Sequence, residues 1–383
     1  MTRNFSTIVL ALCLALAVPA SAKDEKLKQP VIQLAILLDT SGSMEGLIDQ
    51  AKSQLWKIVN EFISVKRGGQ RPLLQVALIE YGNNRLTSDE HFVKLVTPLT
   101  DDLDKISEAL FALKASTTPG SEEYPGAAIK AAVARLDWSK SGADLKVIYV
   151  AGNEAFDQGP IDFRESCKGA ITKGVQINTI FCGSQADGIA TLWKDGALLA
   201  DGAFMSIDHN AQVVAIVAPQ DKELAELGVK INDTFVPYGR DAIAGRDNQA
   251  KQDANTAGVS SEAAVQRAVT KASANYRNGA WCLVDGVYLE NLKLEDVKEA
   301  DLPQVMRKMT LTERKDYLAT QKQNREAIQK RIATLSEERS RYVAEEMKKT
   351  TDKDGKQTLD AAIIGSIRKQ AEAKDYQFEQ SPK

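Results

Sequence analysis

The sequence predicts an α/β fold, with a mostly parallel central sheet wrapped by helices on both faces and an α-helical C-terminal extension behind it. Between residues 31 and 207, short apolar runs alternate with amphipathic stretches of helical period, and after residue 207 the strand pattern fades. Several runs are apolar throughout, as expected for strands that helices cover on both faces.

The order of these runs gives the expected elements. The predicted strands are 31–38, 73–79, 92–96, 145–151, 175–181 and 203–207. The predicted helices between them are 47–62, 103–113, 127–136, 161–172 and 189–199. Run 92–96 follows its predecessor without a helix between them, which predicts one antiparallel edge strand, since parallel neighbours need a long crossover.

The C-terminal part reads as helical. Stretches 221–235 and 261–276 have helical patterns, whereas 238–259 is rich in Gly, Asp, Asn and Ala and predicts a loop. Stretch 311–349 contains neither Gly nor Pro and predicts one long helix. The expected division is a signal peptide (1–22), an α/β domain (31–215), a helical extension (216–305), and a long C-terminal helix and tail (306–383).

The long helix carries a broken heptad seam. Its apolar members are Leu318, Ile328, Ile332, Leu335 and Tyr342, and the residues that interrupt it are Gln321, Arg325 and Arg339. One interpretation is a coiled coil that joins two copies of the chain into a homo-oligomer. The other, which we favour, is a solvated helix laid on its own chain.

The N-terminus has the features of an export signal. Arg3 precedes a short apolar segment at 8–18, and the small residues Ala20, Ser21 and Ala22 follow. The segment is short for a membrane span, and no later run is long enough for one. We therefore expect cleavage after Ala22 and a free periplasmic or secreted protein with no membrane span in the mature chain.

Composition excludes several classes of function. The 49 Lys+Arg residues nearly balance the 52 Asp+Glu, and a net charge of −3 argues against a nucleic-acid binder that relies on phosphate attraction. With two histidines, a histidine-rich metal cluster is excluded. Beyond the signal peptide lie Cys167, Cys182 and Cys282, without a Cys-x-x-Cys pair. Cys167 on a helix and Cys182 at a strand end lie too far apart in height for a disulfide, so we expect buried thiols.

A group of oxygen-bearing side chains follows the first predicted strand. Asp39, Ser41 and Ser43 supply one carboxylate and two hydroxyls, spaced two residues apart before an amphipathic helix. A tight turn can point all three toward one position, and hard oxygen ligands suit Mg²⁺. Ligands of open α/β sheets collect outside the carboxyl ends of the strands. The alternative is a plain polar turn in which Ser43 caps the helix.

At Asp39-Thr40-Ser41-Gly42-Ser43 the chain resembles the von Willebrand factor type A (VWA) domain, whose metal-ion-dependent adhesion site opens with Asp-x-Ser-x-Ser. The resemblance covers about residues 31–207 and implies a Rossmann-like fold. It implies that Asp39, Ser41 and Ser43 hold one divalent cation, Mg²⁺ with Mn²⁺ or Ca²⁺ as alternatives. It also implies a protein partner whose acidic side chain completes the coordination. The chain looks like exported bacterial proteins with this domain and a helical tail.

Two further loops depart from the family pattern. In the second loop the place of the family's Thr falls on Glu123, with Thr118 or Ser121 as substitutes. In the third loop Gly152 takes the place of the family's Asp, and Glu154 or Asn153 could supply oxygen instead. An acid gained in one loop and lost in the other would keep the total charge. We expect an altered but retained cation site of Asp39, Ser41, Ser43, Glu123 and Glu154, with a metal-free, vestigial pocket as the alternative.

The sequence predicts a binding function rather than an enzyme. His91 and His209 lack a Gly-x-Ser-x-Gly nucleophile elbow, and no Gly-x-x-x-x-Gly-Lys phosphate loop occurs. We expect an exported, cation-dependent protein-binding module. The alternative is a structural or assembly protein, in which the C-terminal helix mediates association and the metal pocket is vestigial.

Overall fold

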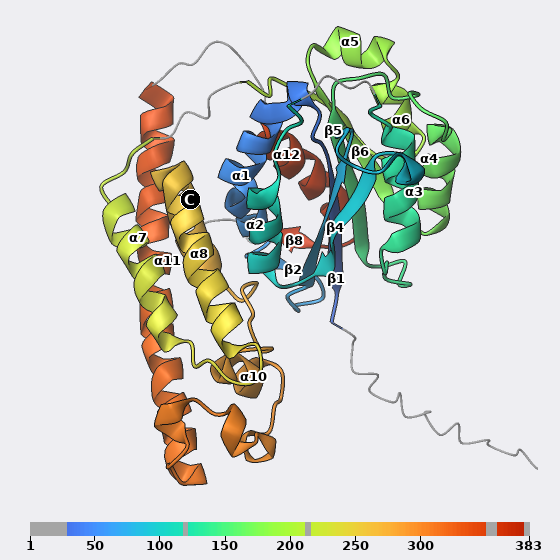
Figure 1. The fold of residues 1–383 in the computed structure, drawn as a ribbon. Coiled ribbons are helices and arrows are strands. Elements are labelled where there is room, and N and C mark those ends of the chain that lie inside the picture. The colour runs from blue at the N-terminus through green and yellow to red at the C-terminus, as the bar shows by residue number, and fades with distance from the viewer. Residues whose placement is uncertain (1–28, 118–121, 211–215, 350–357, 379–383) are drawn as a thin grey trace, which may run out of the picture.

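The computed structural model describes residues 29–117, 122–210, 216–349 and 358–378. Its centre is a six-stranded sheet with the order β4-β3-β1-β5-β6-β7 (Figure 1). The strands are β1 (Val31–Asp39), β3 (Leu73–Tyr81), β4 (Val93–Thr100), β5 (Leu145–Gly152), β6 (Gln176–Cys182) and β7 (Phe204–Ile207). β4 pairs antiparallel with β3, and the other pairs in this sheet are parallel. The predicted sheet and its antiparallel edge strand are confirmed.

β1 lies inside the sheet, between β3 and β5, and serves two cores. Ile32, Leu34 and Leu38 face one core, whereas Ala35 and Leu37 face the other. Successive side chains of a strand point to opposite faces, so a strand covered on both faces is expected to carry apolar residues on both. Burial on both faces therefore explains why this run shows no alternation of polar and apolar residues.

Helices cover both faces of the sheet. Within the first core lie residues of α1 (Glu45–Asn60), α2 (Leu103–Ala112) and α12 (Leu359–Glu372). Within the second core lie residues of α3 (Pro125–Arg135), α4 (Phe163–Thr172) and α6 (Trp193–Leu198). Two short 3-10 turns, η1 (Gly42–Met44) and η2 (Ser88–Glu90), precede α1 and β4. This three-layer arrangement is the one that the sequence predicts.

One helix of the prediction corresponds to two separate helices in the structure. Stretch 189–199 divides into the end of α5 (Gln185–Ala190) and α6. The break lies at Leu192, whose backbone is left-handed with φ +67° and so cannot continue a right-handed helix. After the break, the Trp193 ring packs edge-on against Phe156, with ring centroids 4.9 Å apart. The burial of this aromatic pair is a tertiary contact that the helical period could not show.

The helical extension contains α7 (Asp221–Lys230), α8 (Ala242–Val259), α9 (Ser261–Lys271), α10 (Leu283–Leu289) and α11 (Leu311–Lys349), with short 3-10 turns η3 (Ile231–Thr234), η4 (Leu294–Asp296), η5 (Glu299–Asp301) and η6 (Gln304–Met306). The predicted loop at 238–259 is wrong, because most of it is α8. The buried face of α8 is polar, with Gln249, Gln252 and Thr256 among its buried side chains. A helix that buries polar groups gives no apolar period, which explains the error.

α11 is confirmed at its predicted bounds and lies on its own chain, against α7, α9 and η3. The buried members of its seam are Leu318, Ile332 and Leu335. Two of the residues that interrupt the seam form buried ion pairs within the chain: Arg325 with Asp285, and Arg339 with Asp221 at 2.6 Å. The seam is therefore filled by this chain itself, as the favoured interpretation expects.

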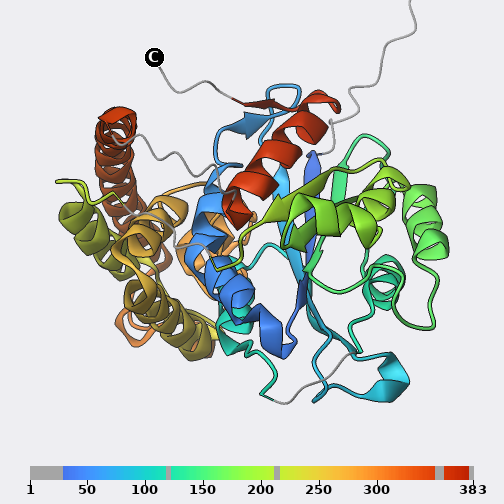
Figure 2. The same cartoon turned by 90° about the horizontal axis from the view of Figure 1, so that it is seen from above.

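The end of the chain returns to the sheet. α12 packs beside α1 and contacts β5 and β7, and its Ile363 and Ile367 join the first core (Figure 2). β8 (Gln377–Phe378) then pairs antiparallel with β2 (Val65–Lys66). Residues 358–378, which the sequence division placed in a tail, thus complete the first α/β layer. The helical extension lies between β7 and α12 in the chain.

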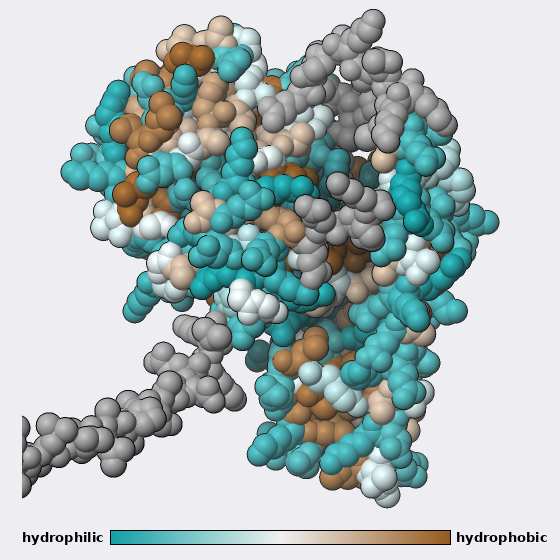
Figure 3. Space-filling view, turned by 180° about the vertical axis from the view of Figure 1, so that it is seen from behind, coloured by the Kyte–Doolittle hydropathy of each residue, from teal (hydrophilic) through white to brown (hydrophobic). Residues whose placement is uncertain are grey.

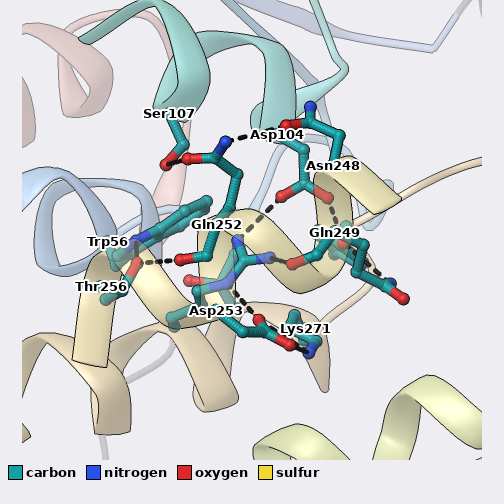
Figure 4. A network of polar contacts seen from close by, with 12 residues as sticks. Trp56, Asp104, Ser107, Asn248, Gln249, Gln252, Asp253, Thr256 and Lys271 are labelled. Carbon is teal, nitrogen blue, oxygen red and sulfur yellow. Dashed lines mark hydrogen bonds and ion pairs between the residues drawn. The ribbon is translucent and has the colours of Figure 1, made fainter. Parts of the chain in front are cut away.

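A buried polar network joins the extension to the α/β domain (Figure 4). Its centre is Arg267 of α9, which is 2% exposed and pairs with Asp104 of α2 at 2.8 Å and with Asp253 of α8 at 2.5 Å. Its guanidinium also lies over the ring of Trp56 of α1, 4.7 Å from the centroid. A buried cation needs such partners, because burial without them costs several kcal/mol. The network fixes α9 against α1 and α2.

Hydrophilic residues cover much of the face in Figure 3, with apolar side chains in separate groups. The large apolar side chains that remain exposed include Leu198, Leu199, Val217, Tyr288, Leu289 and Val305. Within the described ranges, no helix is both long and apolar enough to cross a membrane.

Candidate metal centre

The predicted site residues of the first loop do lie together. Asp39 is the last residue of β1, at the carboxyl edge of the sheet, and is 1% exposed. The backbone N–H of Ser41 donates to Asp39 Oδ1 at 2.8 Å, so the turn folds back onto the carboxylate. The hydroxyls of Ser41 and Ser43 lie 3.2 Å apart. Buried Ser41 and exposed Ser43 thus present a pair of oxygens beside a buried carboxylate.

Glu123 brings a second carboxylate to the same place. It precedes α3 by two residues and is 4% exposed, and its side chain interacts with that of Asp39. The backbone N–H of Glu123 donates to Oε1 of Gln158 at 2.6 Å, which ties the second loop to the third. Among the described residues, Asp39 Oδ2 and Glu123 Oε2 are buried oxygens without a hydrogen-bond partner. A buried polar oxygen without a partner is costly and calls for a missing donor or ion.

The electrostatics of this pair disfavour the state in which both carboxyl groups are ionised. Burial raises the pKa of Asp39, against the opposing effect of its hydrogen bonds from Ser41. Burial and then the charge of Asp39 raise the pKa of Glu123. Two carboxylates that share a site cannot both ionise cheaply, unless positive charge lies between them. A divalent cation supplies that charge.

In the third loop it is the amide of Asn153, and not the carboxylate of Glu154, that contacts the first loop. The side chain of Asn153 lies within hydrogen-bond distance of the Ser43 hydroxyl, with Nδ2 at 3.2 Å. The Glu154 side chain is exposed, although its negative charge contributes to the raised pKa of Asp39 and Glu123. Its backbone carbonyl accepts a hydrogen bond from the Trp193 indole at 2.7 Å. Glu154 therefore stands at the rim, whereas Asn153 contacts the first loop. Thr118 and Ser121 lie outside the described residues.

Close packing around Asp39 involves residues that sequence reasoning missed. Gly82 follows β3 with φ +75°, and a Cβ there would come within 2.6 Å of Asp39 Oδ1. A Cβ at Gly152 would come within 2.5 Å of the Tyr81 hydroxyl and 3.1 Å of Asp39 Oδ2. The Tyr81 hydroxyl itself donates to the Ala151 carbonyl at 2.9 Å. Gly152, which takes the place of the family's Asp, is thus the residue that this packing requires. For Gly82, the only signal in the sequence is its position just after a predicted strand.

These oxygens fit a small hard cation better than a soft metal. The set is two carboxylates and two hydroxyls, with an amide nearby, and it contains no thiolate or imidazole. Within the described residues, no group of three or more His, Cys, Asp or Glu side chains could hold a metal. The described cysteines are free and buried, in agreement with the prediction of unpaired thiols. The candidate centre therefore depends on hydroxyl oxygens to complete it.

Comparison with known proteins supports the fold. The family model of the von Willebrand factor type A domain matches residues 33–191, a span that includes all five predicted site residues. No curated protein matches the chain.

Several solved structures are similar to part of the chain. An aerotolerance-related membrane protein from Bacteroides fragilis, with multiple mutations to serines, is 16% identical, with a TM-score of 0.33; the match covers 47% of this chain and 93% of that one. The conserved hypothetical protein BatB from Bacteroides thetaiotaomicron is 17% identical, with a TM-score of 0.36; the match covers 46% of this chain and 90% of that one. The SpRpn10 VWA domain is 17% identical, with a TM-score of 0.35; the match covers 48% of this chain and 100% of that one. The family model covers less than half of the chain, and within it the sheet order and the antiparallel edge strand agree with the Rossmann-like fold of the von Willebrand factor type A domain.

Proposed function

We propose that this protein is an exported module that binds a protein partner through a divalent cation at the carboxyl end of β1. One observation carries the proposal: two buried carboxyl groups, Asp39 and Glu123, meet beside the hydroxyls of Ser41 and Ser43, and each carboxyl keeps one oxygen without a partner. In an apolar interior, burial of such a pair without a counter-charge is unfavourable. A divalent cation between them would supply the counter-charge that lets both carboxyl groups ionise.

In this proposal Asp39, Ser41, Ser43 and Glu123 hold the ion, and Glu154 adds negative charge at the rim. Mg²⁺ suits a site with few carboxylates, because it keeps part of its water shell, and Mn²⁺ or Ca²⁺ are the alternatives. The exposed side of the loop, at Ser43, leaves room for an outside ligand. When bound, the ion would offer an open position to an acidic side chain of the partner.

The remaining parts of the proposal concern place and activity. Export rests on the sequence pattern of residues 1–22, which lie outside the described residues, with cleavage after Ala22. A binding role without catalysis rests on the absence of a nucleophile elbow and a phosphate loop from the sequence. The assembly alternative loses support, because α11 buries its apolar seam within its own chain.

Selection of peptides from a random displayed library tests the binding function. The chain is immobilised in Mg²⁺, and bound peptides are released with EDTA. We expect the released peptides to be enriched in Asp or Glu and to lose binding to the variant Asp39→Asn. The control is Asp157→Asn, which removes an exposed carboxylate from the loop beside the site and should bind as the wild type does. Peptides that bind equally in EDTA, or equally to Asp39→Asn, would contradict the proposal.

A further inference from the structure

A groove of about 310 Å³ opens beside the candidate metal centre. One wall is the first half of α1, and the other is the segment 113–117 that follows α2, together with Arg85 from the turn after β3. Its floor includes the buried side chains of Ile48 and Leu113. Ligand sites in proteins occupy about 300–1,000 Å³, so this groove lies at the small end and would take a few side chains rather than a large ligand.

The groove begins at the cation loop. Gly42, between the two serines of the site, lines it, and a Cβ at Gly42 would come within 3.1 Å of the Ser116 carbonyl. The backbone N–H of Ser116 donates to the Thr40 carbonyl at 2.9 Å, so the far wall is tied to the same loop. At the other end Lys52 Nζ donates to the Leu113 carbonyl at 3.0 Å and bridges the two walls. A partner segment that leaves the metal centre can therefore continue into the groove.

Apart from Lys52 of α1, whose Nζ donates to the Leu113 carbonyl, the two walls carry opposite charges. On α1, Glu45 and Asp49 are four residues apart and so share one helix face, and both line the groove. On the other wall stand Arg85 and Lys114. The Arg85 guanidinium is held in place by hydrogen bonds to the Lys114 and Ala115 carbonyls, at 3.4 and 2.7 Å. Lys114 and Asp49 are exposed, and they line the groove on its two different walls.

We propose that this groove selects the residues that flank the metal-binding acid of the partner: an extended segment with an acidic side chain toward Lys114 and a basic side chain toward Asp49. The inference rests on the proposed function of the metal centre. Neighbouring side chains of an extended segment point in opposite directions, so adjacent residues meet opposite walls. Complementary charges of this kind give specificity more than affinity, because the wrong sign at either wall is repelled.

The test is the same Mg²⁺-dependent selection of displayed peptides, repeated on the variants Lys114→Glu and Asp49→Lys. We expect wild-type selections to show an acid and a base at fixed, adjacent positions beside the metal-binding acid. Lys114→Glu should change the selected acid to a base, and Asp49→Lys should change the selected base to an acid. The matched control is Lys168→Glu, which reverses an exposed lysine on α4 and should leave the selected sequences unchanged.

The outcomes separate the two proposals. Peptides that need Mg²⁺ and Asp39, but show no preferred charge at the flanking positions, would overturn the groove and leave the metal-centre function standing. So would preferences that do not change sign in both wall variants. If no peptide requires Mg²⁺, the proposed function fails first. Because both substituted side chains are exposed, we expect thermal unfolding of Lys114→Glu and Asp49→Lys to match the wild type, and loss of folding would not explain a changed preference.

Discussion

The hydroxyl of Tyr81 lies 2.5 Å from the position that a Cβ of Gly152 would occupy. No side chain fits at residue 152 unless Tyr81 moves, and Tyr81 is 1% exposed and donates to the Ala151 carbonyl. The acid that the VWA resemblance implies in the third loop therefore has no room here. Glu123, two residues before α3, brings a carboxylate to Asp39 from another side. The site thus lacks an acid at residue 152 and has one at Glu123 instead, so the two departures from the family pattern compensate in charge.

The first prediction concerns this packing. Gly152→Ala should lower the free energy of unfolding by about 1–3 kcal/mol, the usual cost of an extra methyl group in a tightly packed interior. Urea denaturation measures the change. Gly142→Ala is the matched control, because a Cβ at Gly142 has nothing within 4 Å and should change stability little. Equal effects of the two substitutions would contradict the close approach of Tyr81.

The second prediction concerns the two buried carboxyl groups. In EDTA, Glu123→Gln should be about as stable as the wild type, because burial and the charge of Asp39 raise the pKa of Glu123 to about 9, and Gln has the shape of the neutral acid that this pKa favours near pH 7. Mg²⁺ at 100 times its dissociation constant should stabilise the wild type by about 2.7 kcal/mol and stabilise Glu123→Gln less. Thermal unfolding with and without Mg²⁺ measures both effects, and Asp157→Asn should respond to Mg²⁺ as the wild type does. A Glu123→Gln protein that gains as much as the wild type would exclude Glu123 as a ligand.

The third prediction concerns the junction between the α/β domain and the helical extension. Asp104 accepts from Arg267 at 2.8 Å and from the Tyr276 hydroxyl at 2.5 Å, and all three side chains are buried. Asp104→Asn keeps the shape and removes the charge, so it should cost about 3–5 kcal/mol, as for other broken buried ion pairs. Glu108→Gln is the control at the same junction. It breaks an exposed pair with Lys251, which should be worth less than about 1 kcal/mol. Similar losses in the two variants, measured by urea denaturation, would contradict a central role for the buried network.

The fourth prediction is a dependence of stability on pH. Burial alone would raise the pKa of Asp253, but the charges of Arg267 and Lys271 outweigh it and hold this pKa below its ordinary value of 3.8. A carboxylate with a lowered pKa stabilises the fold above its unfolded pKa, and this contribution is lost as the pH falls through the folded value. Asp253→Asn should therefore be less stable than the wild type near neutral pH, with a gap that narrows as the pH falls below 3.8 and through the lowered pKa of the folded state.

Urea midpoints over this pH range measure that gap. Asp247→Asn, which changes an exposed carboxylate on the same helix, should follow the wild type throughout. A gap that stays constant down to the lowest pH would show that Asp253 does not hold its charge in the way that its contacts with Arg267 and Lys271 indicate.

The sequence predicts the sheet well because the apolar pattern of each strand lies within a few consecutive residues. Residues 34–38 are apolar throughout, and burial in two cores on opposite faces favours that pattern. α11 is likewise predicted at its observed bounds, since a long stretch without Gly or Pro leaves few alternatives. α8 is missed because its inward side chains, such as Gln252, bond to polar partners and leave no apolar period.

The candidate site is predicted in part for the same reason. Asp39, Ser41 and Ser43 are close in sequence, so their spacing alone indicates that they can meet. The role of Glu123 depends on the family resemblance, because it reaches Asp39 only through the fold. The amide of Asn153 and the bond from Glu123 to Gln158 join loops that are far apart in sequence, and no pattern within one loop shows them.

Calorimetric titration of Mn²⁺ into the chain, after treatment with EDTA, tests the metal centre most directly. We expect one ion to bind per chain in the wild type and in Asp157→Asn. We expect binding to be lost in Asp39→Asn and weakened in Ser43→Ala, since the first removes a carboxylate ligand and the second a hydroxyl. Absence of binding to the wild type, or equal binding to Asp39→Asn, would contradict the proposal that these oxygens hold a divalent cation.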